Sequence, residues 1–474
     1  MENKTAFHRS LTLLDGALLV IGSMIGSGIF IVSADIARNV GSAGWLIVVW
    51  LLSGFITLAA ALSYGELSGM FPQAGGQYVY LREAFGKRFG FLYGWSFFAV
   101  IQTGTIAAVG VAFAKFASYL LPVLGEDNIL VAAGSFHISA AQILSISIIV
   151  LLTWINTQGV ESGKWIQFFF TFAKIAALLS LAVCGFMFIR DHNVWNDNWT
   201  MGWMAKTIQT QGGAIKHETL NPAGLTIAIC LAMVGALFSS DAWNNVTFIA
   251  GEIKKPERNI GLSLFIGTFT VTILYISVNL MYVNVLSVSE IANAPHDRVA
   301  IAAALKIFGG IGTTIIALMI MVSTFGCNNG LILSGARVYY TMANDGLFLP
   351  AAKKLNKKGV PVTALWMQCA WASILCLSGH YGDLLDYIVF VVLIFYILTI
   401  GGIFVLRKKL PDHPRPYKAF GYPVIPMLYI ALATFICIVL LAYKRENSLA
   451  GLIIVLAGLP IYYFIEKRSK EKND

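Results

Sequence analysis

The sequence predicts an all-α integral membrane protein with twelve transmembrane helices, and three observations carry this prediction. Hydrophobic residues make up 57% of the 474 residues, and the mean hydropathy is +0.74. Charged residues make up 12%, about half the fraction of a soluble protein. The charges also leave long gaps between them, so the surplus apolar surface must face lipid. This composition excludes a soluble enzyme, a secreted disulfide scaffold and a disordered chain.

Twelve stretches without Asp, Glu, Lys or Arg follow one another along the chain. A transmembrane helix needs roughly 20 apolar residues. Because no water reaches the backbone in hydrocarbon, each stretch should be helical except where it lines a cavity. The fifth stretch reaches back to Trp165 if Lys174 lies inside the membrane, and the sixth reaches on to Ala250 if Asp241 does. In order, the stretches are residues 16–34, 39–65, 89–114, 128–160, 175–189, 219–240, 259–289, 307–336, 359–382, 387–406, 419–443 and 447–465.

The distribution of positive charge orients these helices. Because twelve is even, both termini lie on one side of the membrane. Loops on that side carry 23 Lys and Arg residues, loops on the other side carry seven, and Lys115, Lys174 and Lys306 fall within helices. By the positive-inside rule, both termini are cytoplasmic. We therefore expect a multi-pass protein of the cell (plasma) membrane, embedded in the lipid bilayer, and no nucleic acid partner despite the net charge of +9.

Two of the stretches carry signs of a broken helix. The first contains three glycines in the seven residues GSMIGSG at 22–28, and each weakens a helix by about 1 kcal/mol relative to alanine. Close helix packing through a GxxxG pair would explain them equally well. The sixth contains FSSDAWNN at 238–245, which places a carboxylate in mid-membrane at a cost of about 2.5–3.5 kcal/mol. This second pattern favours a real interruption in both helices.

The two interruptions stand five helices apart, which predicts a duplication. Corresponding interruptions in two halves are typical of inverted repeats in secondary transporters. Since five is odd, the second block enters the membrane from the opposite side. The predicted regions are a cytoplasmic tail (1–10), a first repeat of helices 1–5 (11–190), an extracellular loop (191–222), a second repeat of helices 6–10 (223–407), a cytoplasmic loop (408–423), helices 11 and 12 (424–466) and a cytoplasmic tail (467–474).

Broken helices expose backbone groups that can bind a ligand. Free amides at the start of a half-helix carry partial positive charge, and free carbonyls at the end of a half-helix carry partial negative charge. An anionic group would bind the amides of Ser27, Gly28 and Ile29, and the Ser27 hydroxyl. An ammonium group would bind the carbonyls of Met24, Phe238 and Asp241. A carboxylate and an ammonium side by side describe an α-amino acid.

Selectivity among amino acids must then come from side chains around the rest of the pocket. The nearest candidates are Phe238, Trp243 and Asn244. For Trp243, a position facing lipid or packed in the core is an equally good explanation, because the chain has 11 tryptophans.

Lys174 is the second charge that is costly inside the membrane. It lies nine residues into its span, roughly 13 Å at 1.5 Å per residue, which is farther than its side chain can reach towards water. An inward-facing Lys174 is therefore favoured over a snorkelling one. Its ammonium group would bond the carbonyl of Gly22 and the hydroxyl of Ser323, in the place where related transporters hold a sodium ion. Transport would then be independent of sodium, and titration of Lys174 would offer proton coupling.

Seven motifs in order along the chain resemble those of the amino acid, polyamine and organocation transporter superfamily, and specifically its L-type amino acid transporter branch. The resemblance covers about residues 10–430. The motifs are IGSMIGSGIF (21–30), YGELSGMFPQAGGQYVYLREAFG (64–86), FTFAKIAALL (170–179), LFSSDAWNNV (237–246), GEIKKPERNIG (251–261), STFGCNNG (323–330) and RKKLPDHPRPYKAFGYPVIP (407–426).

The resemblance implies a leucine-transporter-type fold with five plus five inverted helices and two extra C-terminal helices. Members of the superfamily move amino acids by alternating access, many as one-for-one exchangers without sodium. Carried over to this chain, the carboxylate-binding amides fall on Ser27 and Gly28, and the sodium-replacing lysine on Lys174. The amine-binding carbonyls fall on Met24, Phe238 and Asp241, with Phe238 as the gating aromatic residue.

Two departures from the family pattern limit this transfer. Animal L-type members are linked to a single-span glycoprotein through a cysteine between helices three and four, whereas residues 121–137 contain none. No disulfide-linked heavy chain is therefore expected. The sixth helix reads SSDAW where many relatives have an aromatic residue and a glycine, so the size of the substrate stays open, from alanine and serine to branched or aromatic residues.

We therefore expect a sodium-independent transporter of neutral L-amino acids that works by alternating access as an exchanger. Two alternatives remain, a proton-coupled symporter that uses Lys174 and a sensor that binds amino acids without moving them. We see no metal cluster, nucleophile–base pair or phosphate loop, so we expect no enzymatic activity, no cofactor and no metal. Asp15 and Glu66, near helix ends, are expected to serve as caps or interfacial residues.

Overall fold

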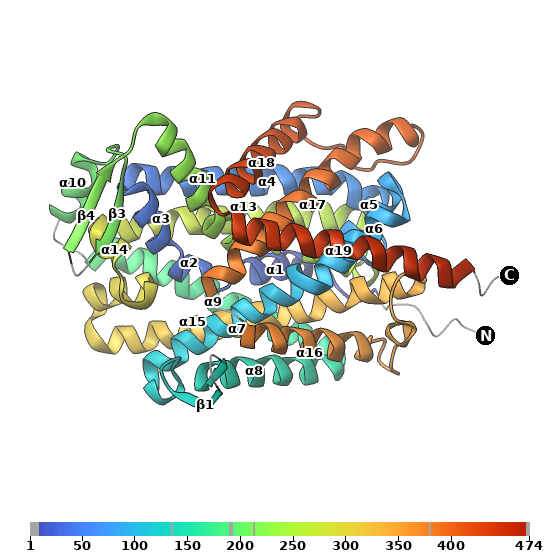
Figure 1. Cartoon of the computed structure of the whole chain (residues 1–474), viewed down its shortest axis with the longest axis horizontal. Coiled ribbons are helices and arrows are strands. Elements are labelled where there is room, and N and C mark those ends of the chain that lie inside the picture. Colours follow the sequence, from blue (N-terminus) through green and yellow to red (C-terminus); the bar gives the residue numbers. More distant parts are fainter. Residues whose placement is uncertain (1–8, 134–135, 189–192, 212–213, 379–380, 471–474) are drawn as a thin grey trace.

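The computed structural model describes residues 9–133, 136–188, 193–211, 214–378 and 381–470, and within them the chain forms a bundle of long helices (Figure 1). Within these ranges, eleven helical segments are long and apolar enough to cross a membrane. A further apolar helix, α16 (Val362–Ser378), has 17 residues. The prediction of a helical membrane protein is confirmed, whereas the count of twelve spans stays a prediction.

The helices follow the predicted stretches closely. The first half of the chain contains α1 (Leu13–Met24), α2 (Gly28–Ile31), α3 (Ser33–Val40), α4 (Ala43–Met70), α5 (Gln77–Phe85), α6 (Lys87–Ser96), the π-helical turn η1 (Phe97–Ile101), α7 (Gln102–Leu120), α8 (Ala140–Thr157) and α9 (Val160–Phe188). The second half contains α11 (Pro222–Ser239), α12 (Asn245–Phe248), α13 (Pro256–Val285), α15 (Val299–Asn344), α16, α17 (Tyr381–Lys409), α18 (Val424–Tyr443) and α19 (Arg445–Lys470).

Shorter elements lie between these helices. They are η2 (Pro122–Leu124), β1 (Ile129–Ala133), β2 (Phe136–Ser139), α10 (Asn193–Thr200), β3 (Lys206–Gln211), β4 (Ala214–Thr219), η3 (Ala250–Glu252), α14 (Val288–Ala292), η4 (Pro295–Asp297) and η5 (Pro350–Lys353). The strands form two antiparallel hairpins, β1–β2 and β3–β4. In Figure 1, α3, α10, α14 and the β3–β4 hairpin gather at one end of the bundle, and the described ends of the chain lie at the other.

Two predicted helix limits are wrong. The stretch 128–160 was expected to be helical throughout, but its first part is the β1–β2 hairpin. The helix starts only after Ser139, which forms a capping box with Gln142 and so fixes the N-terminus of α8. The eighth stretch was expected to end before Arg337, yet α15 continues to Asn344. Arg337 is tolerated inside the bundle because Glu252 neutralises it, with 3.0 Å between Nε and Oε1.

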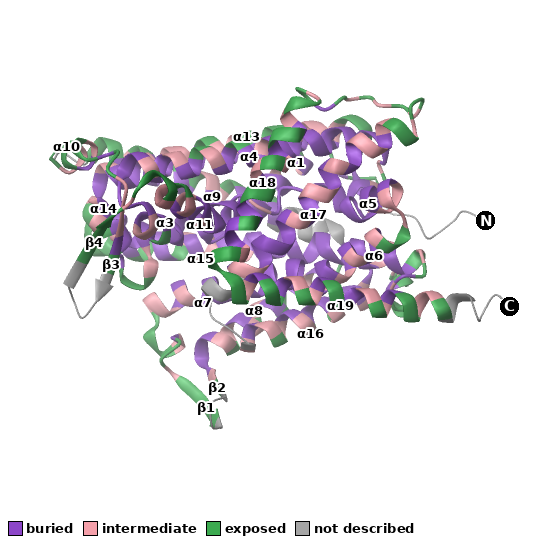
Figure 2. Cartoon of the chain, turned by 45° about the horizontal axis from the view of Figure 1, so that its top comes forward, coloured by how far each residue is buried: buried purple, intermediate pink, exposed green. Residues whose placement is uncertain are grey.

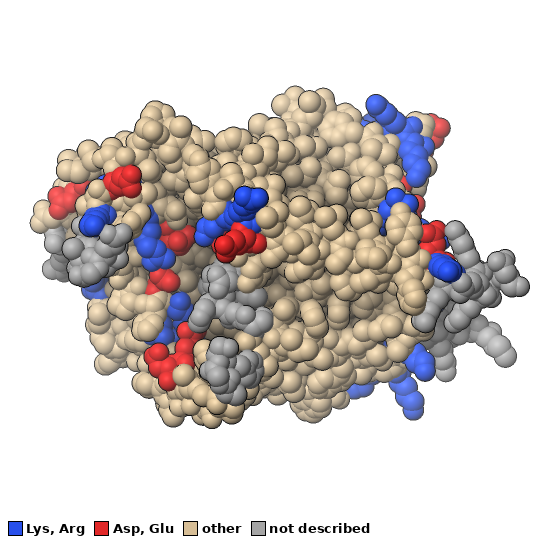
Figure 3. All heavy atoms as spheres, in the orientation of Figure 1, with Lys and Arg blue, Asp and Glu red and all other residues tan. Residues whose placement is uncertain are grey.

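The distribution of buried, apolar and charged residues along the bundle suits a membrane protein. Buried residues run through its middle, while outer helices such as α19 carry exposed positions (Figure 2). Exposed hydrophobic side chains such as Phe435, Ile438 and Ile453 lie on α18 and α19. On the face in Figure 3, charged side chains gather towards the two ends and leave a broad uncharged band between them. That band suits contact with hydrocarbon.

Candidate functional site

The first helix of the bundle is interrupted where the sequence predicted. α1 ends at Met24 and α2 begins at Gly28, so residues 25–27 lie outside either helix. Ile25 departs from helical geometry with a ψ of 87°, and the Gly26 amide donates to the Met24 carbonyl at 2.8 Å. We call residues 25–27 the first break.

The sixth predicted stretch is interrupted as well. α11 ends at Ser239 and α12 begins at Asn245. Between them, Ala242 has a φ of 63°, in the left-handed region that residues with a side chain seldom adopt. Strain of this kind is common at functional sites. We call residues 240–244 the second break.

The two breaks lie against each other, and Tyr275 of α13 joins them. Its hydroxyl is 3.0 Å from the carbonyl oxygens of both Met24 and Ser239, and the side chain is buried. A Cβ added at Gly28 would collide with the side chain and the Cα of Ser239. Glycine at this position therefore serves the contact between the two broken helices, and the breaks form one unit.

The same face of α13 also holds the half-helix after the first break. Asn279 accepts a hydrogen bond of 2.6 Å from Ser33 in α3, and the Tyr282 hydroxyl donates to the Ile29 carbonyl at 3.3 Å. Together with Tyr275, these residues follow the four- and three-residue spacing of one helix face. The sequence analysis missed this face, since nothing in its residue types marks it.

Two of the three carbonyls predicted to bind an ammonium group, those of Met24 and Phe238, already have partners within the protein. The Met24 carbonyl accepts from Tyr275. The Phe238 carbonyl accepts from the amide of Asp241 at 3.2 Å. A ligand amine at these atoms would share them with the protein groups or displace those groups.

The predicted anion-binding amides open the half-helix after the first break. The first four amides of a helix lack partners in the preceding turn, and no backbone hydrogen bond engages those of Gly28 and Ile29 within the described part of the chain. Ser27, which precedes them, is buried together with both. These amides can donate hydrogen bonds to an anionic group once the protein groups that bury them move aside.

Lys174 of α9 reaches the first break. Its ammonium group donates to the carbonyls of Gly22 at 2.8 Å and Ile25 at 2.7 Å, and the residue is buried. The contact with Gly22 agrees with the predicted geometry. Ser323 of α15 shares one of these carbonyls, since its hydroxyl is 3.2 Å from the Ile25 oxygen and 3.3 Å from that of Gly26. Lys174 and Ser323 thus meet at a shared acceptor.

Aromatic residues surround the second break. Tyr396 of α17 donates to Oδ1 of Asp241 at 2.5 Å. Trp243 is buried, with its ring 4.8 Å from that of Tyr64 and 5.2 Å from that of Tyr396. The lipid-facing alternative for Trp243 is therefore excluded. Tyr64 and Tyr396 are further residues of this region that the sequence analysis did not single out.

Asn244 connects the second break to two other helices. Its amide group donates to Gln77, the first residue of α5, at 3.1 Å, and Gln77 donates to Thr399 of α17 at 3.0 Å. All three residues are buried. Asn244 therefore has a structural partner in this conformation in addition to its predicted role near the substrate.

The cavities at the second break are much smaller than the cavity at the end of the bundle that carries α3. Two internal cavities of about 10 and 20 Å³ flank the second break, and each is of the size of one or two water molecules. A vestibule of about 450 Å³ opens at the end that carries α3, which is large enough for an amino acid. Val32 and Gly235 line its floor and touch each other, since a Cβ on Gly235 would lie 2.9 Å from the Val32 Cβ.

The vestibule is lined by charges of both signs. Arg38 donates to Asp297 at 2.7 Å, and Lys444 lies 3.2 Å from Asp386. The side chain of Asp35 is 53% exposed. The protein walls nevertheless desolvate it and raise its pKa, an effect opposed by Arg38 and Lys444. A mixed surface of this kind suits a zwitterion better than an ion of either sign.

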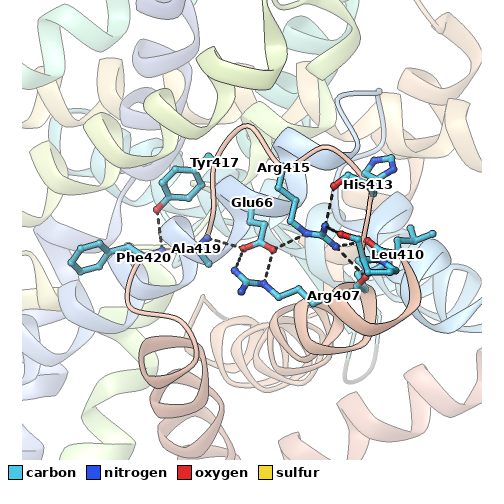
Figure 4. A network of polar contacts seen from close by, with 10 residues as sticks. Glu66, Arg407, Leu410, His413, Arg415, Tyr417, Ala419 and Phe420 are labelled. Carbon is cyan, nitrogen blue, oxygen red and sulfur yellow. Dashed lines mark hydrogen bonds and ion pairs between the residues drawn. The ribbon is translucent and has the colours of Figure 1, made fainter.

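The opposite end is closed by a network around Glu66 of α4 (Figure 4). Arg407 of α17 binds the carboxylate in bidentate fashion at 2.9 and 2.7 Å, Arg415 approaches it to 3.5 Å, and the Ala419 amide donates to it at 2.7 Å. Glu66 is fully buried. Its prediction as a cap or interfacial residue is wrong, because the loop after α17 folds back over it. We call these four residues the Glu66 latch.

Asp15, in contrast, does serve as a cap. It forms a capping box with Thr12 at the start of α1. At the same end of the bundle, Leu11 exchanges backbone hydrogen bonds of 3.0 and 2.8 Å with Glu252 and Lys254. This bridge ties the half-helix before the first break to the segment after α12.

Comparison with known proteins agrees with this architecture. Residues 11–465 match the model of the amino acid permease family. The chain is 29% identical to the serine/threonine exchanger SteT of Bacillus subtilis (strain 168), over 97% of both chains. It is 28% identical to the large neutral amino acids transporter small subunit 2 of Homo sapiens, over 97% of this chain and 80% of that one. The Asc-type amino acid transporter 1 of Mus musculus is also 28% identical, over 99% and 84%.

Proposed function

Because the chain belongs to the amino acid permease family, in its L-type branch, we propose that it is a sodium-independent exchanger of neutral L-amino acids. Amino acid transport itself follows from the family and from relatives that are named as amino acid transporters or exchangers. The family and the apolar spans make the chain a multi-pass protein of the cell membrane. Sodium independence, the exchange mode and the neutral substrate class are the proposed part.

The contact of Lys174 with the first break is the observation that carries sodium independence. A sodium ion in a protein is bound by carbonyl and hydroxyl oxygens. Oxygens of that kind are present in the Gly22 and Ile25 carbonyls and the Ser323 hydroxyl. The Lys174 ammonium already donates hydrogen bonds to the two carbonyls. A second cation at this place would meet a fixed positive charge a few ångströms away, which a low-dielectric interior penalises strongly.

For the substrate, we propose main-chain recognition at the two breaks. Its carboxylate binds the amides of Ser27, Gly28 and Ile29, which carry the partial positive charge of a helix N-terminus. Its ammonium group binds carbonyls of Met24, Phe238 and Asp241, and the side chains of Phe238 and Asn244 border the remainder of the pocket. In the structure, the Tyr275 hydroxyl already bonds the Met24 carbonyl. Binding of the ammonium group therefore requires the two breaks to separate slightly.

We also propose how access alternates. The vestibule faces outwards, and the Glu66 latch closes the cytoplasmic end, where positive charge is concentrated in the sequence. The reverse state opens the latch and closes the vestibule over Val32 and Gly235. Twelve helices, arranged as two inverted repeats of five plus two further helices, give the symmetry that such an exchange of gates uses.

Counterflow in proteoliposomes tests the proposal. The purified chain should take up a labelled neutral amino acid only when an unlabelled one is present inside, and at the same rate with sodium or with choline outside. Lys174→Ala should reduce uptake at least tenfold. The matched control is Lys306→Ala, because Lys306 pairs with Glu290 at the surface, 2.7 Å away, and its loss should leave uptake unchanged.

Each rival function gives a different result in the same vesicles. Uptake driven by an inward proton gradient into vesicles without internal amino acid would replace the exchanger by a proton-coupled symporter. Binding of amino acids without any flux would identify a sensor. Sodium-stimulated uptake by the unmodified chain would contradict the role proposed for Lys174.

We propose that the chain works without a disulfide-linked heavy chain. One relative is named a small subunit, but residues 121–137 contain no cysteine. Within the described residues, five of the six cysteines are buried and Cys184 is partly buried. Exchange by the purified chain alone, under reducing conditions, is the expected result.

A further inference from the structure

Asp241 is notable because its partly buried carboxylate bonds to uncharged groups. These are the hydroxyl of Tyr396, at 2.5 Å, and the amide of Ala242. A carboxylate at membrane depth is costly and is a functional candidate by default. Ala242, the next residue, has a left-handed conformation that costs backbone strain.

The smaller cavity beside Asp241 has both polar and apolar residues in its lining. Gln102 and Thr105 of α7 line it, together with Asp241, Asn245 and Tyr396. Asn245 is 1% exposed, and its side-chain Nδ2 has no hydrogen-bond partner within the described structure. Asp241 and Asn245 both line the cavity, so a carboxylate that accepts hydrogen bonds and an amide group with an unused donor border the same space.

A hydroxyl group can form hydrogen bonds with both Asp241 and Asn245. Its proton can be donated to Asp241, and its oxygen can accept from Asn245. A methyl group would leave both without a partner, and an ammonium group, which only donates, would leave Asn245 unpaired. The volume of about 10 Å³ fits one group of the size of water. The cavity borders the second break, where the proposed main-chain site lies.

We propose that Asp241, Tyr396 and Asn245 determine specificity by selecting amino acids whose side chain ends in a hydroxyl close to Cα. The inference rests on the proposed function and narrows its substrate class. In this arrangement Tyr396 orients the Asp241 carboxylate, and Asp241 and Asn245 contact the substrate hydroxyl. Sites built to bind a hydroxyl discriminate strongly against the analogue without it, because their buried polar groups are then left unpaired.

Threonine and valine provide the test, because they have the same shape and differ in one hydroxyl. Each is used to compete with labelled alanine in counterflow by the unmodified chain. Threonine should compete at a concentration at least about tenfold lower than valine, since one unpaired buried group corresponds to about a factor of ten or more. Asp241→Asn, Tyr396→Phe and Asn245→Ala should each bring this ratio towards one. Asp127→Asn, at an exposed loop position, should leave it unchanged.

The outcomes distinguish a failure of the proposed function from a failure of the proposed specificity. If the unmodified chain exchanges no amino acid at all, the proposed function fails and the inference fails with it. If exchange is robust but valine competes as well as threonine, the function stands and the specificity inference is overturned. An unaltered threonine-to-valine ratio in folded Asp241→Asn or Asn245→Ala protein also overturns it, because the cavity would then hold only structural water. Preference for 2,3-diaminopropionate over threonine would identify an amine-binding site instead.

Discussion

The Glu66 latch should control access from the end at which it lies, and Glu66→Gln is the perturbation that tests this. Glutamine keeps the shape of the side chain but removes the charge that Arg407 and Arg415 share. The substitution needs no extra volume, but both carboxylate oxygens accept from N–H groups, so the new NH2 group faces a donor. The change therefore weakens the closed state without creating a cavity.

The size of the effect follows from the contacts. The Glu66 carboxylate accepts three hydrogen bonds of 2.7 to 2.9 Å, and a further guanidinium lies at 3.5 Å. Breaking a buried pair costs about 3–5 kcal/mol, and the side chain of Arg407 is 24% exposed, which lowers the cost to about 2–4 kcal/mol. At 1.4 kcal/mol per factor of ten, opening becomes roughly 30- to 700-fold more favourable.

Thiol labelling measures that opening. Ser68, two residues after Glu66 in α4, is fully buried, so a cysteine placed there reacts with a water-soluble maleimide only when this end of the bundle opens. The labelling rate of Ser68→Cys should rise by at least about 30-fold when Glu66→Gln is added, following the shift in the opening equilibrium. Glu83→Gln is the control, because Glu83 pairs with Arg82 at the same end but is 35% exposed. Equal labelling rates with and without Glu66→Gln, in folded protein, would refute the latch.

Three further predictions concern the breaks and the vestibule. Tyr275→Phe removes the hydroxyl that lies 3.0 Å from the carbonyls of Met24 and Ser239, and the Met24 carbonyl keeps its bond from the Gly26 amide, so the melting temperature should fall by an amount equivalent to about 1–3 kcal/mol. Gly28→Ala should abolish counterflow by forcing the breaks apart at Ser239, whereas Gly401→Ala, where a Cβ meets open space, should not. Because the protein raises the pKa of Asp35, its ionised form destabilises the fold above that pKa. Asp35→Asn should therefore raise the melting temperature at pH 7, and the gain should vanish as the pH falls through the raised pKa towards the ordinary value.

The breaks could be predicted from the sequence because both carry residues that a membrane helix does not normally tolerate. Three glycines and a mid-membrane carboxylate are costly wherever they pack, so their cost is visible without coordinates. Lys174 was predictable for the same reason, since its distance from the end of the span exceeds the reach of its side chain. In each case a local free-energy penalty pointed to a compensating function.

The partners of these residues could not be predicted in the same way. Tyr275 and Tyr396 are two of 18 tyrosines, and only the packing of α13 and α17 against the breaks distinguishes them. Glu66 shows the same limit, because Arg407 is 341 residues away along the chain. A charge near a helix end costs little when water reaches it, so the sequence alone favoured an exposed position. The fold buries it instead.

Lys174 is buried and Asp241 is partly buried near the breaks, and each bonds to uncharged groups of the protein. The Lys174 ammonium donates to two backbone carbonyls 2.7 and 2.8 Å away. The named partners of Asp241 are a hydroxyl and an amide, which orient the carboxylate without neutralising it. Asp241 also lines the two cavities at the second break, and Lys174 lines neither of them. We therefore propose that Lys174 stabilises the first break and that Asp241 takes part in recognition at the second.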